Sequence, residues 1–241
     1  MGKREMQYGQ FCPIAKATEI LGEKWTFLIL RELVMGGRRF NELQRGLGDI
    51  SPALLTARLK SFEEQGLVVR RKIYGQRSYE YWPTKACTEL LPVLSALGQW
   101  GLLYARHNTI DADLDVELLM LYLERSVDPT EMIGDRSIIQ FKFPDLKHQQ
   151  DWWLLINDCN VDLCITDPGK DDDVYFTCTV RTMHDVWMGD RSYREAIGSG
   201  DLVVQGEPGL LKNIGNWLKP SVFAEAPRAP LPQGIGAMAA G

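Results

Sequence analysis

The sequence predicts an α+β fold built in two parts, and two observations carry this prediction. Apolar residues recur mainly at the helical spacing of three and four over the first 125 positions, and they alternate with polar residues from about residue 138 onward. The charge also changes sign: residues 1–110 contain 16 Lys and Arg against 10 Asp and Glu, whereas residues 111–241 contain 11 against 22. The overall charge of −5 therefore hides a basic first half and a strongly acidic second half.

Two helical patterns come first. One runs from Glu23 to Met35 and the next begins at about Arg39. Their apolar residues fall on one face of each helix, which predicts a shared core. These residues are Trp25, Leu28, Ile29, Leu33, Phe40, Leu43 and Leu47.

A third helix is predicted from Ser51 to Gln65. Ser51 supplies an N-cap hydroxyl and Pro52 suits the first helical position. An inward stripe is formed by Leu55, Leu59 and Phe62. The remaining faces carry small, polar or basic residues, namely Ala53, Thr56, Ala57, Arg58, Lys60 and Ser61. Small side chains favour close approach to a DNA major groove, which is roughly 12 Å wide.

A two-stranded hairpin follows this helix. Leu67–Val69 and Ser78–Trp82 have strand composition, and Gly75-Gln76 lies at the turn. The hairpin is strongly basic because it carries Arg70, Arg71, Lys72 and Arg77. Four neighbouring cations favour a line of phosphates as their partner. The alternative is a solvated hairpin edge protected by charge.

These elements in this order resemble the HxlR family of winged helix-turn-helix transcription regulators, which are related to the MarR group. The resemblance covers roughly Cys12 to Trp100 and is carried by three blocks: CPIAKATEILGEKWTFLILREL, RFNELQRGL and ISPALLTARLKSFEEQGLV. It implies a homodimer on a near-palindromic site of double-stranded DNA, with the helix of residues 51–65 in the major groove and the hairpin against the backbone. The chain departs from the family at the wing, where GQRS stands in place of the usual prolines.

Two further arginines open the helix that begins near residue 39. Arg38 and Arg39 can reach a phosphate, although capping or salt bridging explains them equally well. The candidate DNA contacts are therefore Arg38, Arg39, Ser51, Ala53, Thr56, Ala57, Arg58, Lys60, Arg70, Arg71, Lys72 and Arg77.

A long apolar stripe over residues 84–107 exceeds what one small domain needs. It contains Leu90, Leu94, Leu97, Gly101 and Tyr104, widened by Leu91, Trp100 and Leu103. Pro92 either kinks this helix or marks its first turn. We expect the stripe to form the homodimer interface, with help from the N-terminal segment.

The cysteines do not suggest a disulfide framework, a metal site or a cofactor. The five cysteines form no CxxC pair, and the three histidines do not cluster with them. Cys12 lies beside Pro13 ahead of the first helix, a position at which some HxlR members carry a redox or electrophile sensor. A sensor at Cys12 is one interpretation, and a small hydrophobic packing residue is the other.

No targeting or membrane segment is predicted. The start, MGKREMQYGQFCP, lacks the apolar core of a signal peptide, and Leu90–Ala105 is too short to span a bilayer. We expect a cytoplasmic protein without a membrane partner.

The second part is predicted as an antiparallel-sheet α+β domain. After a polar, acidic boundary at 108–115 comes a helix over Val116–Arg125, and strands follow near 138–143, 152–156, 161–166 and 174–180. Helices at 183–188, 192–199 and 210–217, with a short strand at 202–205, complete it. The predicted domains are 1–110, 111–225 and a disordered tail at 226–241, which is rich in Pro, Ala and Gly.

The run from Val161 to Leu218 resembles the sterol-carrier-protein fold in the order of its elements. That resemblance implies an apolar tunnel between sheet and helices. Its candidate lining residues are Trp152, Phe176, Met183, Trp187, Leu210 and Trp217. The same residues would equally serve an ordinary core.

The sequence thus predicts a dimeric, sequence-specific DNA-binding regulator whose acidic C-terminal domain either senses a small apolar molecule or braces the dimer. One alternative is a lipid or acyl-chain carrier whose winged helix serves protein interaction. An enzyme is the least favoured class, because no nucleophile, base and orienting group stand at a recognisable spacing.

Overall fold

The computed structural model describes residues 7–105, 114–134, 136–169, 171 and 173–228. The chain forms two compact units, Met1–Leu97 and Gly98–Gly241, and each is described by itself. The described residues contain no helix long and apolar enough to cross a membrane.

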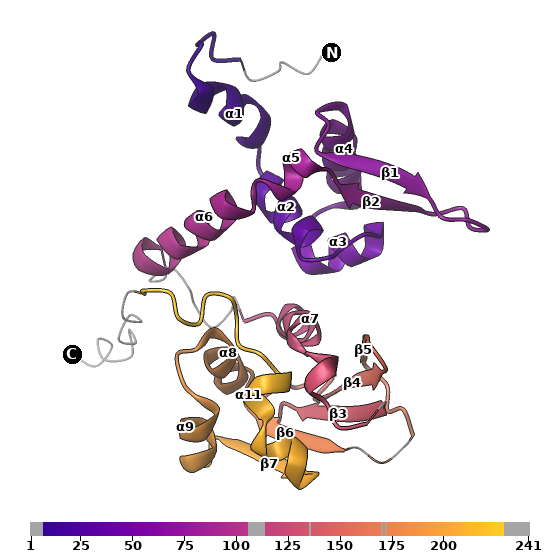
Figure 1. The fold of residues 1–241 in the computed structure, drawn as a ribbon, viewed down its shortest axis with the longest axis vertical. Helices are drawn as coiled ribbons and strands as arrows, with labels where there is room; N and C mark the ends of the chain where they lie inside the picture. Colours follow the sequence, from indigo (N-terminus) through magenta and orange to yellow (C-terminus); the bar gives the residue numbers. More distant parts are fainter. Residues whose placement is uncertain (1–6, 106–113, 135, 170, 172, 229–241) are drawn as a thin grey trace. The chain divides into compact units, whose positions relative to one another are not determined.

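The first unit is a helix-turn-helix with a wing. Its elements in order are α1 (Pro13–Leu21), α2 (Thr26–Val34), α3 (Phe40–Leu47), α4 (Pro52–Glu64), β1 (Val68–Lys72), β2 (Tyr79–Pro83), α5 (Lys85–Thr88) and the start of α6 (Leu91–Tyr104). The β1–β2 hairpin extends away from the helices (Figure 1). The predicted winged helix-turn-helix is confirmed.

The core of this unit is formed by one face of each of α2, α3 and α4. Ile29, Leu30 and Leu33 of α2 are fully buried against Leu43 of α3 and Leu55 of α4. Leu28 is different, because its side chain is 42% exposed. The expectation that Leu28 belongs to this core is therefore wrong, since it lies on the outer face of α2.

Local signals in the sequence set both ends of α4. The Ser51 hydroxyl accepts a hydrogen bond from the Leu54 backbone N–H at 3.3 Å, and Pro52 occupies the first turn. Beyond the last turn, Gly66 has a φ of +70°, a left-handed conformation that favours glycine. The predicted bounds of this helix are confirmed within one residue.

The predicted helix of residues 84–107 is divided in two. Thr84 caps the short α5, and α6 begins at Leu91 with Pro92 in its first turn, where a missing N–H is tolerated. The end of the prediction at His107 lies outside the described residues.

The second unit is an α+β domain. Its elements after the end of α6 are α7 (Val116–Ser126), the 3₁₀ helix η3 (Pro129–Glu131), β3 (Arg136–Lys142), β4 (Asp151–Asn157), β5 (Asn160–Cys164), β6 (Val174–Cys178), α8 (Val180–Met188), α9 (Tyr193–Gly198), β7 (Leu202–Gly206), α10 (Pro208–Lys212) and α11 (Ile214–Trp217). The predicted helix of residues 210–217 is thus two short helices that meet at Asn213.

The sheet of this unit is mixed rather than antiparallel. Its strand order is β5-β4-β3-β6-β7, and β3 pairs with β6 in parallel, with Phe141 opposite Phe176. The predicted α+β class is confirmed, but the prediction of a wholly antiparallel sheet is wrong. The parallel pair forms because β6 lies next to β3, the first strand of this sheet, and not next to β5, the strand that precedes β6 in the chain.

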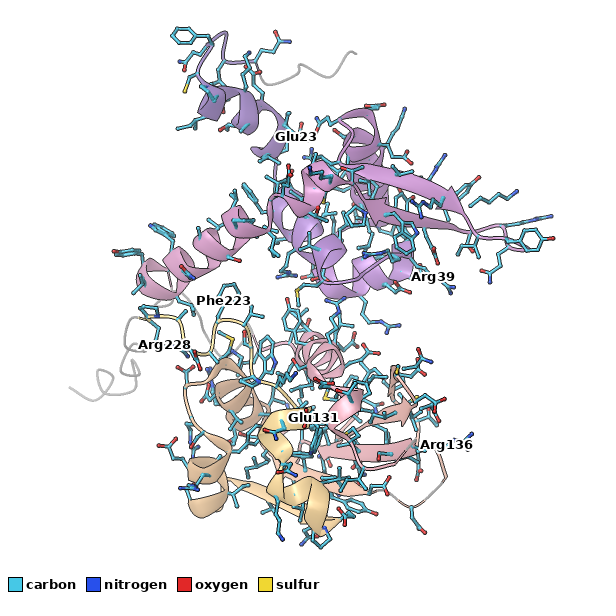
Figure 2. The ribbon with its side chains drawn as sticks, viewed as in Figure 1. Glu23, Arg39, Glu131, Arg136, Phe223 and Arg228 are labelled. Atoms are coloured by element: carbon cyan, nitrogen blue, oxygen red, sulfur yellow. The ribbon has the colours of Figure 1, made fainter. Side chains whose placement is uncertain are left out.

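The end of the described chain has a defined contact. The Arg228 guanidinium donates to the Met188 carbonyl at 2.9 Å and to the Asp190 carboxylate at 3.0 Å (Figure 2). Arg228 falls in the tail predicted to be disordered from residue 226, so that prediction does not hold for residues 226–228; residues 229–241 lie outside the described ranges.

Candidate nucleic-acid interface

The exposed face of α4 is the centre of the candidate interface. Ala53, Thr56, Ala57 and Lys60 are all exposed, whereas Ser61 is half-buried. The Thr56 hydroxyl donates to the Pro52 carbonyl at 2.8 Å, so only its methyl group and oxygen lone pairs face outward. The first carboxylate along this face is that of Glu63. If the flanking residues are left aside, every side chain before Lys60 is no larger than threonine.

Arg58 lies on the flank of α4 and is held within the unit. Its guanidinium forms an ion pair with Glu23, which precedes α2 and is labelled in Figure 2. The Arg58 side chain is only 14% exposed, and burial lowers the pKa of its guanidinium. Arg58 therefore ties α4 to the segment before α2.

Arg38 is also engaged inside its own unit. Its Nη1 donates to the Leu33 carbonyl at 2.6 Å and to the Gly37 carbonyl at 2.9 Å. The guanidinium carbon lies 4.9 Å from the centre of the Trp82 ring, within the range of a cation–π contact. These contacts close the turn between α2 and α3.

Arg39 caps α3. Its backbone N–H donates to the carboxylate of Glu42, the third residue of the helix, at 3.0 Å. The guanidinium Nε lies 3.9 Å from a carboxylate oxygen of Glu80 on β2, and both side chains are partly exposed. This surface pair is weak and can open toward solvent.

The wing ends in a tight turn with an aromatic residue at its tip. The Gln76 backbone N–H donates to the Ile73 carbonyl at 3.2 Å, and Gly75 has a φ of +74°, which identifies a type II turn. Tyr74 occupies the second position of this turn and its side chain is fully exposed.

The four wing cations differ in their partners. Arg70 lies 3.4 Å from a Glu63 oxygen and over the Tyr79 ring, and Arg71 lies over the Trp82 ring. Lys72 and Arg77 have no ion-pair partner among the residues that the structure describes. These two side chains retain the full charge available for an external anion.

The predicted redox residue, Cys12, is the N-cap residue of α1 and is partly exposed. Burial raises the pKa of the Cys87 thiol to about 11 and that of the Cys178 thiol to about 12, so these two are unreactive. All five cysteines are free thiols. Within the described ranges, no three His, Cys, Asp or Glu side chains gather as metal ligands.

Most of the predicted tunnel residues belong to the hydrophobic core of the second unit. Trp152, Phe176, Met183, Leu210 and Trp217 are all buried in the core of the second unit. Phe176 stacks on Phe141 with ring centroids 4.7 Å apart and forms a T-shaped contact with Trp217 at 6.1 Å, so these rings pack against one another. Trp187 alone of the six is only partly buried, and the tunnel itself stays a prediction.

Comparison with known proteins assigns each half of the chain. The HxlR-like helix-turn-helix family matches residues 20–109, and the alkyl sulfatase C-terminal family matches residues 106–223. YkvN, an HTH-type transcriptional regulator of Bacillus subtilis, is 34% identical over 107 residues, which cover 44% of this chain and 90% of that protein. The chain therefore belongs to the HxlR-like helix-turn-helix family.

Other relatives match over a smaller share of their length. An HTH-type transcriptional regulator of Mycobacterium tuberculosis is 40% identical over 89 residues, which cover 36% of this chain. The chain spans 56% of the length of that relative. The solved structure of reduced YodB, a transcriptional regulator from B. subtilis, is 30% identical and covers 38% of this chain and 92% of that one, with a TM-score of 0.35.

Three features of the interface could not be found from sequence reasoning. Glu23 and Glu63 each form an ion pair with an arginine of another element, and nothing in the local sequence pattern indicates these pairings. The third feature is the exposed Tyr74 at the tip of the wing. Its position beside the predicted Gly75-Gln76 turn is the signal that could have indicated this place in the hairpin.

Proposed function

We propose that this protein is a sequence-specific DNA-binding transcriptional regulator that acts as a homodimer. The observation that carries the proposal is the outer face of α4, where small exposed residues are followed by Lys60. Such a face can approach base edges closely, and a helix of 13 residues is long enough to cross the major groove. In this proposal Ser51, Ala53, Thr56 and Ala57 face the bases.

The wing supplies the backbone contacts. Lys72 and Arg77 are exposed and form no ion pair within the described residues, which supports their assignment to phosphates. Arg39, Arg70 and Arg71 can join them only by leaving or sharing their present partners. We propose structural roles instead for Arg38 and Arg58, because their guanidinium groups serve the fold.

The homodimer interface is proposed at α6. None of its residues is buried, and Leu91, Val93, Leu97, Trp100 and Tyr104 are each at least 46% exposed. Such a helix buries its apolar surface only against a partner, and a second copy of the same helix is self-complementary. Two exposed apolar residues of the N-terminal segment, Phe11 just before α1 and Ile14 within it, support the participation of this segment.

The remaining roles extend the same proposal. We place the domain boundary near residue 110 and propose a sterol-carrier-like C-terminal domain that senses a small apolar molecule or braces the dimer. An acidic domain is repelled by DNA, which supports a place away from the duplex. A redox role for Cys12 stays a prediction.

The test is fluorescence anisotropy with the DNA upstream of the protein's own coding region, over a salt series and with unrelated competitor DNA. Ala57→Glu places a carboxylate on the proposed reading face and Ala86→Glu places one on the exposed side of α5, so the two variants are matched in chemistry. Repulsion by the duplex should weaken binding of Ala57→Glu by about 100-fold or more, with little change for Ala86→Glu. Equal binding by both variants would remove α4 from the interface.

If the unsubstituted protein does not prefer its upstream DNA to the unrelated competitor, the next experiment is a genome-wide selection of bound DNA fragments. Failure of that selection as well, together with co-purified apolar ligand, would favour the carrier alternative.

A further inference from the structure

The second unit contains a pocket that has one of the predicted tunnel residues, Trp187, in its wall. It has a volume of about 180 Å³ and lies between α7 and α8, beside Asp115 at the start of α7. Its walls include Leu118, Val180 and Trp187. An engineered apolar cavity of about 150 Å³ is enough to hold a benzene ring, so this pocket has room for one six-membered ring and a small substituent.

The walls of this pocket are fixed before any ligand arrives. The Trp187 indole N–H donates to the Ser126 hydroxyl at 2.8 Å, which ties α8 to the end of α7. The Trp187 ring also stacks on Tyr122 with centroids 5.0 Å apart and planes 9° from parallel. A wall held in this way loses little conformational entropy on binding.

One side chain in the wall gives the pocket a polar anchor. His184 lines the pocket, and its Nδ1 lies 3.0 Å from the Asp185 carboxylate. An ionised carboxylate only accepts hydrogen bonds, so in the singly protonated tautomer that fits this contact Nδ1 carries the proton and Nε2 is an acceptor. The ring therefore suits a ligand that donates a hydrogen bond.

The charges around the pocket select against an anion. Asp115 lines the pocket and Asp185 lies directly behind the His184 ring. Arg181 is 3.9 Å from the same Asp185 carboxylate and offsets that charge, but no cation offsets Asp115 within the described lining. A cation would in turn lose its hydration against the apolar wall. A neutral ligand avoids both penalties.

We propose that the pocket between α7 and α8 binds a neutral single-ring phenol, with the ring against Leu118 and Trp187 and the hydroxyl donating to His184 Nε2. The use of this site as an effector site rests on the proposed regulatory function, whereas binding itself does not.

The test is isothermal titration of the full chain with p-cresol, toluene and benzoate. We expect saturable 1:1 binding of p-cresol and weaker binding of both other probes. Leu118→Trp fills the pocket and should weaken p-cresol binding by about tenfold or more, because overpacking leaves no room for the ring. Ile165→Trp, at a position that is 59% exposed on the same domain, is the matched control and should change binding less than twofold.

A second variant tests the anchor. His184→Phe should reduce p-cresol binding to the level of toluene and leave toluene unchanged. If Leu118→Trp fails to fold, Met188→Trp fills the same pocket from α8. The proposal is overturned if p-cresol does not bind saturably, if it binds equally to the filled variants, or if benzoate binds as tightly.

These outcomes separate the ligand site from the proposed function. Lack of p-cresol binding by a protein that binds its DNA overturns the pocket proposal alone. Saturable p-cresol binding by a protein without specific DNA binding supports the pocket and counts against the regulator.

Discussion

The packing of α2 against α3 makes Gly46→Ala a severe change despite its small size. A Cβ on Gly46 would lie 1.9 Å from Glu32 Oε2 and 2.4 Å from Glu32 Cδ. The Glu32 side chain is fully buried, and Arg31 Nε donates to its other oxygen at 2.9 Å. The same arginine donates from Nη2 to the Gly46 carbonyl at 2.8 Å, so the carboxylate cannot move without disturbing all three residues.

The expected loss of stability follows from two opposing effects. Disrupting a buried ion pair costs about 3–5 kcal/mol, here because the Glu32 carboxylate stays buried without full compensation. Replacing glycine by alanine inside a helix stabilises it by about 1 kcal/mol. The net effect on the free energy of unfolding is a loss of about 2–4 kcal/mol, a large share of the 5–15 kcal/mol that folded domains usually have.

The assay is hydrogen exchange of the α2–α4 amides, read by mass spectrometry so that each unit is followed separately. A double-mutant cycle with Glu32→Ala tests the cause: once the carboxylate is removed, Gly46→Ala should cost little or become favourable. Unchanged or slower exchange in the Gly46→Ala single variant would refute the reasoning.

Three further predictions address the interface, the dimer and acid stability. Arg77→Ala should lower the slope of log K against log salt by about one unit per bound protomer, measured by anisotropy. Trp100→Glu should shift the molar mass in light scattering toward the monomer, and an unchanged mass would exclude the outer face of α6. Hydrogen bonds from Lys219 and Thr130 hold the pKa of Asp128 at about 2, below its ordinary 3.8, so its stabilising contribution is present above pH 3.8 and is lost as the pH falls through 2. Asp128→Asn should therefore flatten the acid-unfolding curve in this range, followed by circular dichroism.

The elements that the sequence predicts correctly are those with local signals. Ser51 caps the start of α4 and Pro52 follows it in the first turn, so neighbouring residues mark where the helix begins. The buried residues from Leu55 to Phe62 then recur at the helical spacing. The alternation around Phe141 identifies β3 in the same way, because each buried residue is two positions from the next. Such signals depend only on neighbours in the chain.

The features that escaped prediction depend on contacts between distant residues. The parallel pairing of β3 with β6 joins Phe141 to Phe176, which no local pattern can specify. The buried position of Trp217 also depends on a distant residue, because its ring forms a T-shaped contact with Phe176. An apolar residue of a core and one of a cavity look the same in sequence, since both are selected for size and hydrophobicity.

The partners of the basic residues decide how strongly DNA binding should depend on salt. The eight basic candidates taken from the sequence would give a dimer a slope of about −14, if each contacted one phosphate. Within the described residues Lys72 and Arg77 form no ion pair, and Lys60 forms only an exposed pair with Glu64 at 3.7 Å, which water and salt screen. Three contacts per protomer predict a slope of about −5 for a dimer. A measured slope near about −5 would mean that DNA affinity depends mainly on the uncharged face of α4. A slope near about −14 would require Arg39, Arg58 and Arg70 to exchange their glutamate partners for phosphates on binding.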